Sequence, residues 1–189
     1  MAHYIIGVIK MNIPSLNRTT RYFHWLSAFI MLGLISVGYY MVYWEVWALY
    51  PTHKSIGVLA LLVVLPRALY RLQKGLLSPA TVVSNHQQKL IEAAHWALLA
   101  GTILMPISGM LYSGFGGYGI DIFGFTLVAS NYIDSAAVPY NETIFILAKA
   151  AHSYIAYCLT GLIALHILGA FKHHLLSKDV TLLRMLGRA

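Results

Sequence analysis

The chain has 189 residues, of which 59% are hydrophobic and only 10% are charged, and its mean hydropathy is +0.68. This composition excludes an ordinary soluble domain and indicates a membrane protein. The net charge of +7 is explained by contact with anionic lipid headgroups and requires no nucleic acid partner.

Four long apolar segments predict four transmembrane helices, since a helix needs roughly 20 mostly apolar residues to cross the hydrocarbon. They cover roughly residues 22–44, 53–72, 89–113 and 143–172. We therefore expect an all-α fold, an integral membrane four-helix bundle in which residues 1–189 form a single membrane domain. A single cysteine excludes a disulfide framework.

One long connection, residues 114–142, joins the third and fourth apolar segments. It begins with the glycine-rich run "GFGGYG" and continues with the amphipathic run "IDIFGFTLVAS". This pattern is typical of a lid that lies on a membrane surface. We expect this loop at the outer face.

The basic residues predict the orientation, because Lys and Arg accumulate in cytoplasmic segments. Eleven of the thirteen lie on one side of the expected bundle, and only Lys54 and Lys149 lie near the other side. Both termini are therefore predicted to be cytoplasmic. The eleven are Lys10, Arg18, Arg21, Arg67, Arg71, Lys74, Lys89, Lys172, Lys178, Arg184 and Arg188.

The last apolar segment contains the run "HSYIAYCLTGLIALH", which begins at His152 and ends at His166. Fourteen residues are about 3.9 helical turns, so the two imidazoles share a helix face and lie roughly 21 Å apart along the axis. The other spans place His24 at the inner level of His166, and His53 at the outer level of His152. Four histidines on three helices therefore agree in depth, as two pairs.

Each histidine alone could be an amphipathic side chain that reaches the interface. Their agreement in depth favours a function, because ionisable groups inside a membrane are costly. Two imidazoles that face each other across a bundle can bind the iron of a planar macrocycle from both sides, which points to b-type haem. A zinc site is the competing interpretation, but zinc prefers four ligands in one tetrahedral cluster. The predicted iron ligands are His24, His53, His152 and His166.

Several stretches carry a pattern in their order and spacing: "RYFHWLSA", "HKSIGVL", "AAHWALL" followed by "ISG", "KAAHSYIAYCLTGLIALHILGAFKHH" and "DVTLLRML". Together they resemble the bacterial cytochrome b561 proteins, which are four-helix, di-haem membrane cytochromes. The resemblance implies two haem b groups held by the same pairs, His24 with His166 and His53 with His152. It also implies electron transfer linked to the quinone pool, and a multi-pass location in the bacterial inner (cytoplasmic) membrane.

Other basic residues are candidates for binding haem propionates as charge-assisted donors. Lys54 and Lys149 each lie close to an outer ligand in the sequence and break the positive-inside bias. Arg67 and Arg71 lie near the inner level, where that bias alone explains them. We therefore expect the two lysines to be the better cofactor contacts.

Two further histidines are candidates for a quinone site. His95 is expected near the inner surface, where it could bind a propionate or a quinone, or simply reach the headgroups. His173 lies two helical turns beyond His166, on the same face and roughly 10 Å closer to the cytoplasm. An imidazole there could supply a hydrogen bond and a proton to a quinone. The alternative is that "KHH" is only a basic helix C-terminus, but the family resemblance favours the site.

Three classes of function remain open. The first is a cytochrome that moves electrons between the quinone pool and a donor or acceptor at the outer face. Part of the family oxidises superoxide there and reduces ubiquinone, and the outer lysines could attract that anion. The second is a haem-b membrane-anchor subunit that relays electrons for a partner oxidoreductase or a periplasmic redox protein. The third, a transporter with pathway histidines, is disfavoured because no span has a carboxylate at its centre.

Overall fold

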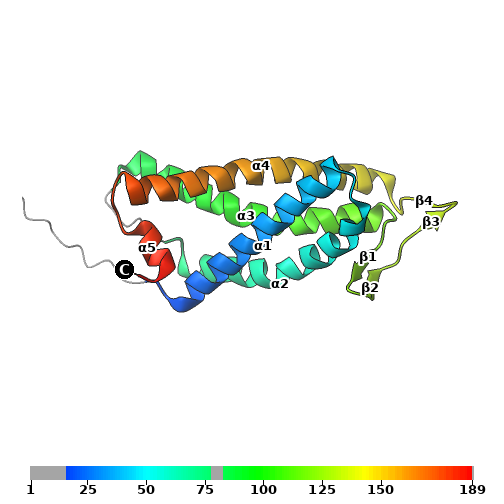
Figure 1. The fold of residues 1–189 in the computed structure, drawn as a ribbon, viewed down its shortest axis with the longest axis horizontal. Helices are drawn as coiled ribbons and strands as arrows, with labels where there is room; N and C mark the ends of the chain where they lie inside the picture. Colours follow the sequence, from blue (N-terminus) through cyan, green and yellow to red (C-terminus); the bar gives the residue numbers. More distant parts are fainter. Residues whose placement is uncertain (1–15, 78–82, 189) are drawn as a thin grey trace, which may run out of the picture.

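Four long helices lie side by side in the computed structural model, which describes residues 16–77 and 83–188 (Figure 1). They are α1 (Arg18–Tyr43), α2 (Tyr50–Lys74), α3 (Asn85–Phe115) and α4 (Glu142–Leu175). Each is long and apolar enough to cross a membrane. The predicted all-α architecture with four spans is confirmed, whereas the side of the membrane that the termini occupy stays a prediction. Lys10, counted in that prediction, lies outside the described residues.

Each long helix begins before the apolar segment that predicted it, and polar caps fix the first turns of α1, α3 and α4. The Asn17 side chain accepts a hydrogen bond from the Thr19 amide at 2.9 Å, and that of Asn141 accepts one from the Ile144 amide at 3.0 Å. Ser84 and Gln87 form a reciprocal capping box at the start of α3. Such side chains satisfy amide groups that a helix start leaves unpaired. Hydropathy marks where the chain is apolar and does not mark these caps.

The bundle has two distinct ends. The hairpin end carries a short 3-10 turn, η1 (Trp47–Leu49), and the residues between α3 and α4 (Figure 1). The opposite end, where α1 begins, carries the short helix α5 (Thr181–Leu186) and is called here the terminal end. Helix α3 packs against both α4 and α2, and α2 packs against α1.

The connection between α3 and α4 forms two small antiparallel hairpins instead of one continuous amphipathic segment. Strand β1 (Ile120–Ile122) pairs with β2 (Phe125–Val128), and β3 (Tyr132–Ile133) pairs with β4 (Ala136–Ala137). Gly119 has a φ of +67°, and a Cβ there would lie 2.9 Å from the Ser130 amide nitrogen. This left-handed, crowded position suits only glycine.

Helix α2 holds the first hairpin by polar contacts. The Lys54 ammonium donates hydrogen bonds to the carbonyls of Tyr118 at 3.2 Å and Gly119 at 3.0 Å. The Ser55 hydroxyl donates to the Asp121 carbonyl at 2.9 Å and accepts from the Phe123 amide at 3.2 Å. Ser55 is buried, so these bonds replace water that its hydroxyl has lost.

The apolar core of the bundle is a small cluster formed by Met31, Met105 and Leu159. Leu159 lies seven residues after His152 and seven before His166 on α4. The cluster therefore sits at mid-depth, about two helical turns from each histidine level. Helices α1, α3 and α4 each contribute one residue to it.

Helix α5 folds back against α1 at the terminal end. The Trp25 indole nitrogen donates a hydrogen bond to the Met185 carbonyl at 3.0 Å. Gly187 ends α5 with a φ of +73°, and the Arg21 guanidinium occupies the space that a Cβ at Gly187 would need. The hydrogen bond joins residues 160 positions apart.

Candidate functional site

The terminal-end histidine pair brings α1 and α4 together. The rings of His24 and His166 have centroids 6.2 Å apart and planes inclined by 55°. A metal bonded to one nitrogen of each of two opposed imidazoles, at about 2.0 Å per bond, places the ring centroids about 6 Å apart. With this separation, His24 and His166 would be able to hold one metal ion together.

A third imidazole, His95 of α3, joins this level. Its ring packs edge-on against His166 with a centroid separation of 5.4 Å and an angle of 85°. Its Nδ1 lies 2.7 Å from the Ile91 carbonyl oxygen, and because a carbonyl can only accept, Nδ1 carries the hydrogen. The Nε2 atom of His95 is therefore left as an acceptor on an exposed ring. Arg67 lies within electrostatic range of His24 and His166.

The hairpin-end pair consists of His53 on α2 and His152 on α4, which lie within electrostatic range of each other. The Nδ1 atom of His152 lies 3.1 Å from the Met105 carbonyl oxygen and 3.1 Å from the Ser108 hydroxyl. The carbonyl again requires that Nδ1 carry the hydrogen, so Nε2 is unprotonated and can bind a metal. This arrangement is typical of metal-bound histidine, whose second nitrogen is oriented by a backbone carbonyl.

Two glycines make room for the hairpin-end rings. A Cβ at Gly109 would lie 2.9 Å from His152 Cε1 and 3.2 Å from its Nδ1, and a Cβ at Gly38 would lie 3.4 Å from His53 Cε1. The Nδ1 atom of His53 is buried and has no hydrogen-bond partner in the structure. The two rings are thus closely enclosed by α1 and α3.

The donor set suits a planar macrocycle better than a tetrahedral ion. Within residues 16–77 and 83–188, no group of three or more His, Cys, Asp or Glu side chains is placed to hold a metal ion. The imidazoles lie as two pairs at different depths, and at least one ring of the four has its hydrogen-bearing nitrogen fixed by a carbonyl. These four histidines would hold haem iron, which would supply one-electron redox chemistry.

The lysines proposed as cofactor contacts are placed differently from each other. The Lys54 ammonium is already bound to two carbonyls of the first hairpin, so it has a structural partner. Lys149 is exposed, and its Nζ lies 5.9 Å from the centroid of the Phe145 ring. Among the arginines, Arg71 donates to the Thr20 hydroxyl at 3.1 Å. Lys149 and Arg67 are therefore the cations with the fewest competing contacts.

His173 forms an acid–imidazole pair near the terminal end. Its Nδ1 lies 2.6 Å from an Asp179 carboxylate oxygen, and the other carboxylate oxygen accepts from the Thr181 amide at 2.9 Å. Burial alone would raise the pKa of Asp179, but the hydrogen bonds from Thr181 and His173 lower it overall. A lowered carboxyl pKa stabilises the fold above the unfolded-state pKa, and this stabilisation is lost as the pH falls through the folded-state pKa.

The sequence did not predict several of these partners. Asp179 lies in the turn before α5, and only the folded turn brings it to His173. The roles of Ser108 and Gly109 depend on how α3 faces α4. Depth alone could have identified Ser108. It lies on α3 two residues after Pro106, at the depth of His152.

Comparison with known proteins gives a match over nearly the whole chain. The family model of the prokaryotic cytochrome b561 proteins matches residues 15–188. Cytochrome b561 homolog 2 of Escherichia coli (strain K12) is 34% identical over 172 residues, which cover 88% of this chain and 88% of that protein.

Proposed function

The chain belongs to the prokaryotic cytochrome b561 family, and from this premise we propose that it is a di-haem cytochrome linking the quinone pool to a redox partner at its hairpin end. Family membership makes it a multi-pass bacterial membrane cytochrome, which implies haem b and electron transfer. The number of haems, the quinone and the inner membrane location are parts of our proposal.

The observation that carries this proposal is the pairing of imidazoles at two depths. His24 and His166 would hold one haem at the terminal end, where their ring separation of 6.2 Å suits a bridging iron. His53 and His152 would hold the other at the hairpin end, with the His152 ring fixed by Met105 and Ser108. Bound haem supplies one-electron redox chemistry at its iron.

The central experiment is a reduced-minus-oxidised optical spectrum of the purified protein, with haem quantified per chain. We expect the bands of low-spin b haem and a stoichiometry of two per chain. One haem per chain would reject the two-level assignment. A protein that binds no haem when its medium supplies it would reject the function altogether.

We further propose that the terminal end faces the cytoplasm, because the basic residues gather there. A reporter fused after Ala189 should behave as cytoplasmic, and one inserted at Ala136 between β3 and β4 should behave as external. The measurement is the activity of a reporter that folds on only one side. If both fusions showed the opposite accessibility, the terminal end would face outward and the proposed orientation would be wrong.

The quinone is proposed to react at the terminal end, next to His173. The Asp179 carboxylate holds Nδ1 of this ring, which leaves Nε2 as the atom that can donate a proton to a reduced quinone oxygen. A protonated imidazole next to a carboxylate is favourable, and an imidazole can act as a general acid. His95 offers a second acceptor on an exposed ring beside His166, so it is the other candidate contact.

Replacing His173 by alanine should leave haem content intact and slow the oxidation of the reduced cytochrome by a soluble quinone by roughly 10²-fold, the usual scale for loss of a general acid. The matched control is His174→Ala, which removes the adjacent imidazole. If both variants slow the reaction equally, "KHH" acts only as a basic helix end. An unchanged rate in His173→Ala would remove this histidine from the quinone site.

The second candidate function is a haem-b anchor that relays electrons for a partner oxidoreductase or periplasmic redox protein. It is favoured by the exposed apolar side chains on and beside the hairpins, which are Phe123, Phe125, Leu127, Tyr132 and Ile133.

Superoxide oxidation coupled to ubiquinone reduction is a more specific form of the first proposal. Lys149 is more available than Lys54 to attract the superoxide anion, because Lys54 is bound to two carbonyls.

A further inference from the structure

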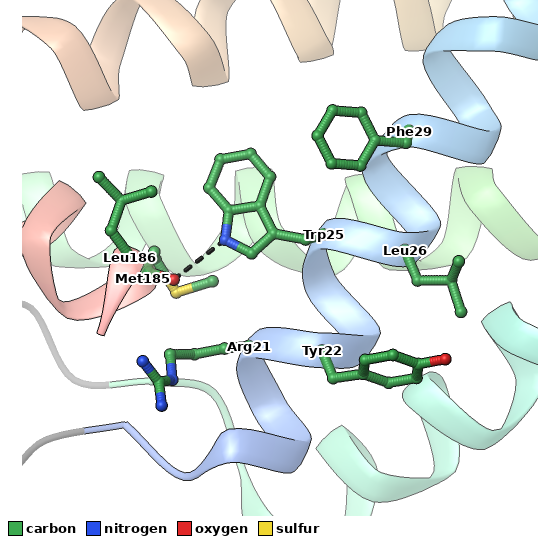
Figure 2. A pocket seen from close by; sticks show the side chains of 7 residues that line it. All are labelled: Arg21, Tyr22, Trp25, Leu26, Phe29, Met185 and Leu186. Carbon is green, nitrogen blue, oxygen red and sulfur yellow. Dashed lines mark hydrogen bonds between the residues drawn. The ribbon is translucent and has the colours of Figure 1, made fainter. Parts of the chain in front are cut away.

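A pocket lies between α1 and α5 at the terminal end (Figure 2). Its lining residue Trp25 also packs edge-on against His24, with ring centroids 5.4 Å apart. Its volume is about 680 Å³, enough for a headgroup and the first part of an acyl chain. It is lined by Arg21, Tyr22, Trp25, Leu26, Phe29, Met185 and Leu186.

The pocket has one polar end and one apolar end. Figure 2 shows Arg21 at one end and Phe29 at the other, with Trp25 between them. These three residues are spaced by four, so they form one stripe along α1 about 12 Å long. The Trp25 indole nitrogen is occupied by the Met185 carbonyl, so its ring offers an apolar surface.

Arg21 has an unsatisfied charge in this apolar setting. Its Nε atom is buried and has no hydrogen-bond partner among the described residues. The terminal end has only two described acids, and both are engaged: Asp179 with His173, and Glu92 with Gln88. A guanidinium that is partly withdrawn from water without an anion is costly.

The open side of the pocket faces the membrane. Tyr22 is 65% exposed and Phe29 is 67% exposed, and α1 is one of the helices able to cross the bilayer. The position of Arg21 in the first turns of α1 puts the charge at headgroup depth, and Phe29 at the depth of the acyl chains. An occupant must therefore be amphiphilic, with its anionic group at Arg21.

We propose that this pocket is a binding site for one anionic phospholipid, whose phosphate contacts Arg21 and whose acyl chain lies against Leu26 and Phe29. The phosphate supplies the charge-assisted acceptors that the guanidinium lacks, and basic pockets at this membrane depth suit such headgroups. Because α5 forms the other wall, the bound lipid also stabilises the contact of α5 with α1. A neutral quinone would leave the charge of Arg21 unpaired.

The test is native mass spectrometry of the detergent-purified full chain, titrated with phosphatidylglycerol or phosphatidylcholine. We expect the wild type to bind one phosphatidylglycerol about tenfold more tightly than Arg21→Gln does, the scale of one charge-assisted contact. Phosphatidylcholine should bind weakly to both proteins. The matched control is Arg18→Gln, which removes an exposed arginine one turn earlier that does not line the pocket.

Arg21→Lys keeps the positive charge and should retain most of the binding, which makes the test independent of the stability of Arg21→Gln. Equal binding of phosphatidylglycerol to the wild type and both Arg21 variants would overturn the proposal. So would equal binding of phosphatidylcholine. Displacement of the lipid by millimolar inorganic phosphate would identify a free phosphate site instead, and displacement by a soluble quinone would identify a quinone site.

Discussion

Replacing His152 by alanine is expected to remove the haem at the hairpin end and to leave the one at the terminal end bound. His152 offers an Nε2 atom to the hairpin-end level only, and a b-type haem with one axial imidazole removed loses much of its binding energy. The haem content should fall from two to about one per chain. The spectrum of the remaining haem should match the one that His24→Ala removes.

The controls for this prediction use the other histidines. His53→Ala should deplete the same spectral component as His152→Ala, and His166→Ala the same component as His24→Ala. His174→Ala should keep both haems, because His174 lies beyond the two levels on α4. The pairing by depth fails if His53→Ala depletes the component that His24→Ala depletes.

Replacing Gly109 by alanine is expected to disturb the same haem without touching a ligand. The new Cβ would lie 2.9 Å from His152 Cε1, so either α3 or the imidazole must move. The ring is held by the Met105 carbonyl and the Ser108 hydroxyl, and overpacking of this kind costs about 1–3 kcal/mol. We expect hairpin-end haem occupancy to fall to about half or less, measured from the pyridine haemochrome content and the spectrum.

Gly161→Ala on α4 is the matched control, because no heavy atom lies within 4 Å of the Cβ that it would add. It should leave both haems bound. If Gly109→Ala binds as much haem as Gly161→Ala, the His152 ring is free to shift and the close enclosure by α3 has no effect on the site.

The sequence was sufficient for features that depend on length, depth and helical period. Mostly apolar runs of about 20 residues identified the four spans, and the fourteen-residue spacing of His152 and His166 placed them on one face of α4. The prediction of four spans succeeds because a membrane restricts helices to nearly parallel directions. The role of the four histidines as iron ligands stays a prediction.

Features that depend on turns and on the relative rotation of helices were not predictable in the same way. The first hairpin turns at Phe123 and Gly124, and the second at Asp134 and Ser135. All four residues have positive φ values, which hydropathy does not reveal. The sequence made Lys54 a candidate contact for a haem propionate, and the first hairpin folds back over it. Asp179 reaches His173 because the chain turns sharply between α4 and α5.

The cluster of Met31, Met105 and Leu159 between the two histidine levels determines how the reaction responds to the membrane potential. An electron passing between the levels crosses roughly 21 Å of about 30 Å of hydrocarbon. Moving one elementary charge across the whole membrane changes the free energy by about 2.3 kcal/mol per 100 mV. Electron transfer between the two levels therefore changes it by about 1.6 kcal/mol per 100 mV. The cluster has no ionisable side chain that could carry a proton along with the electron, so under the proposed function the transfer would be electrogenic. With the proposed cytoplasmic terminal end and the proposed quinone site there, a potential that is negative inside would oppose electron flow toward the quinone and assist flow toward the hairpins.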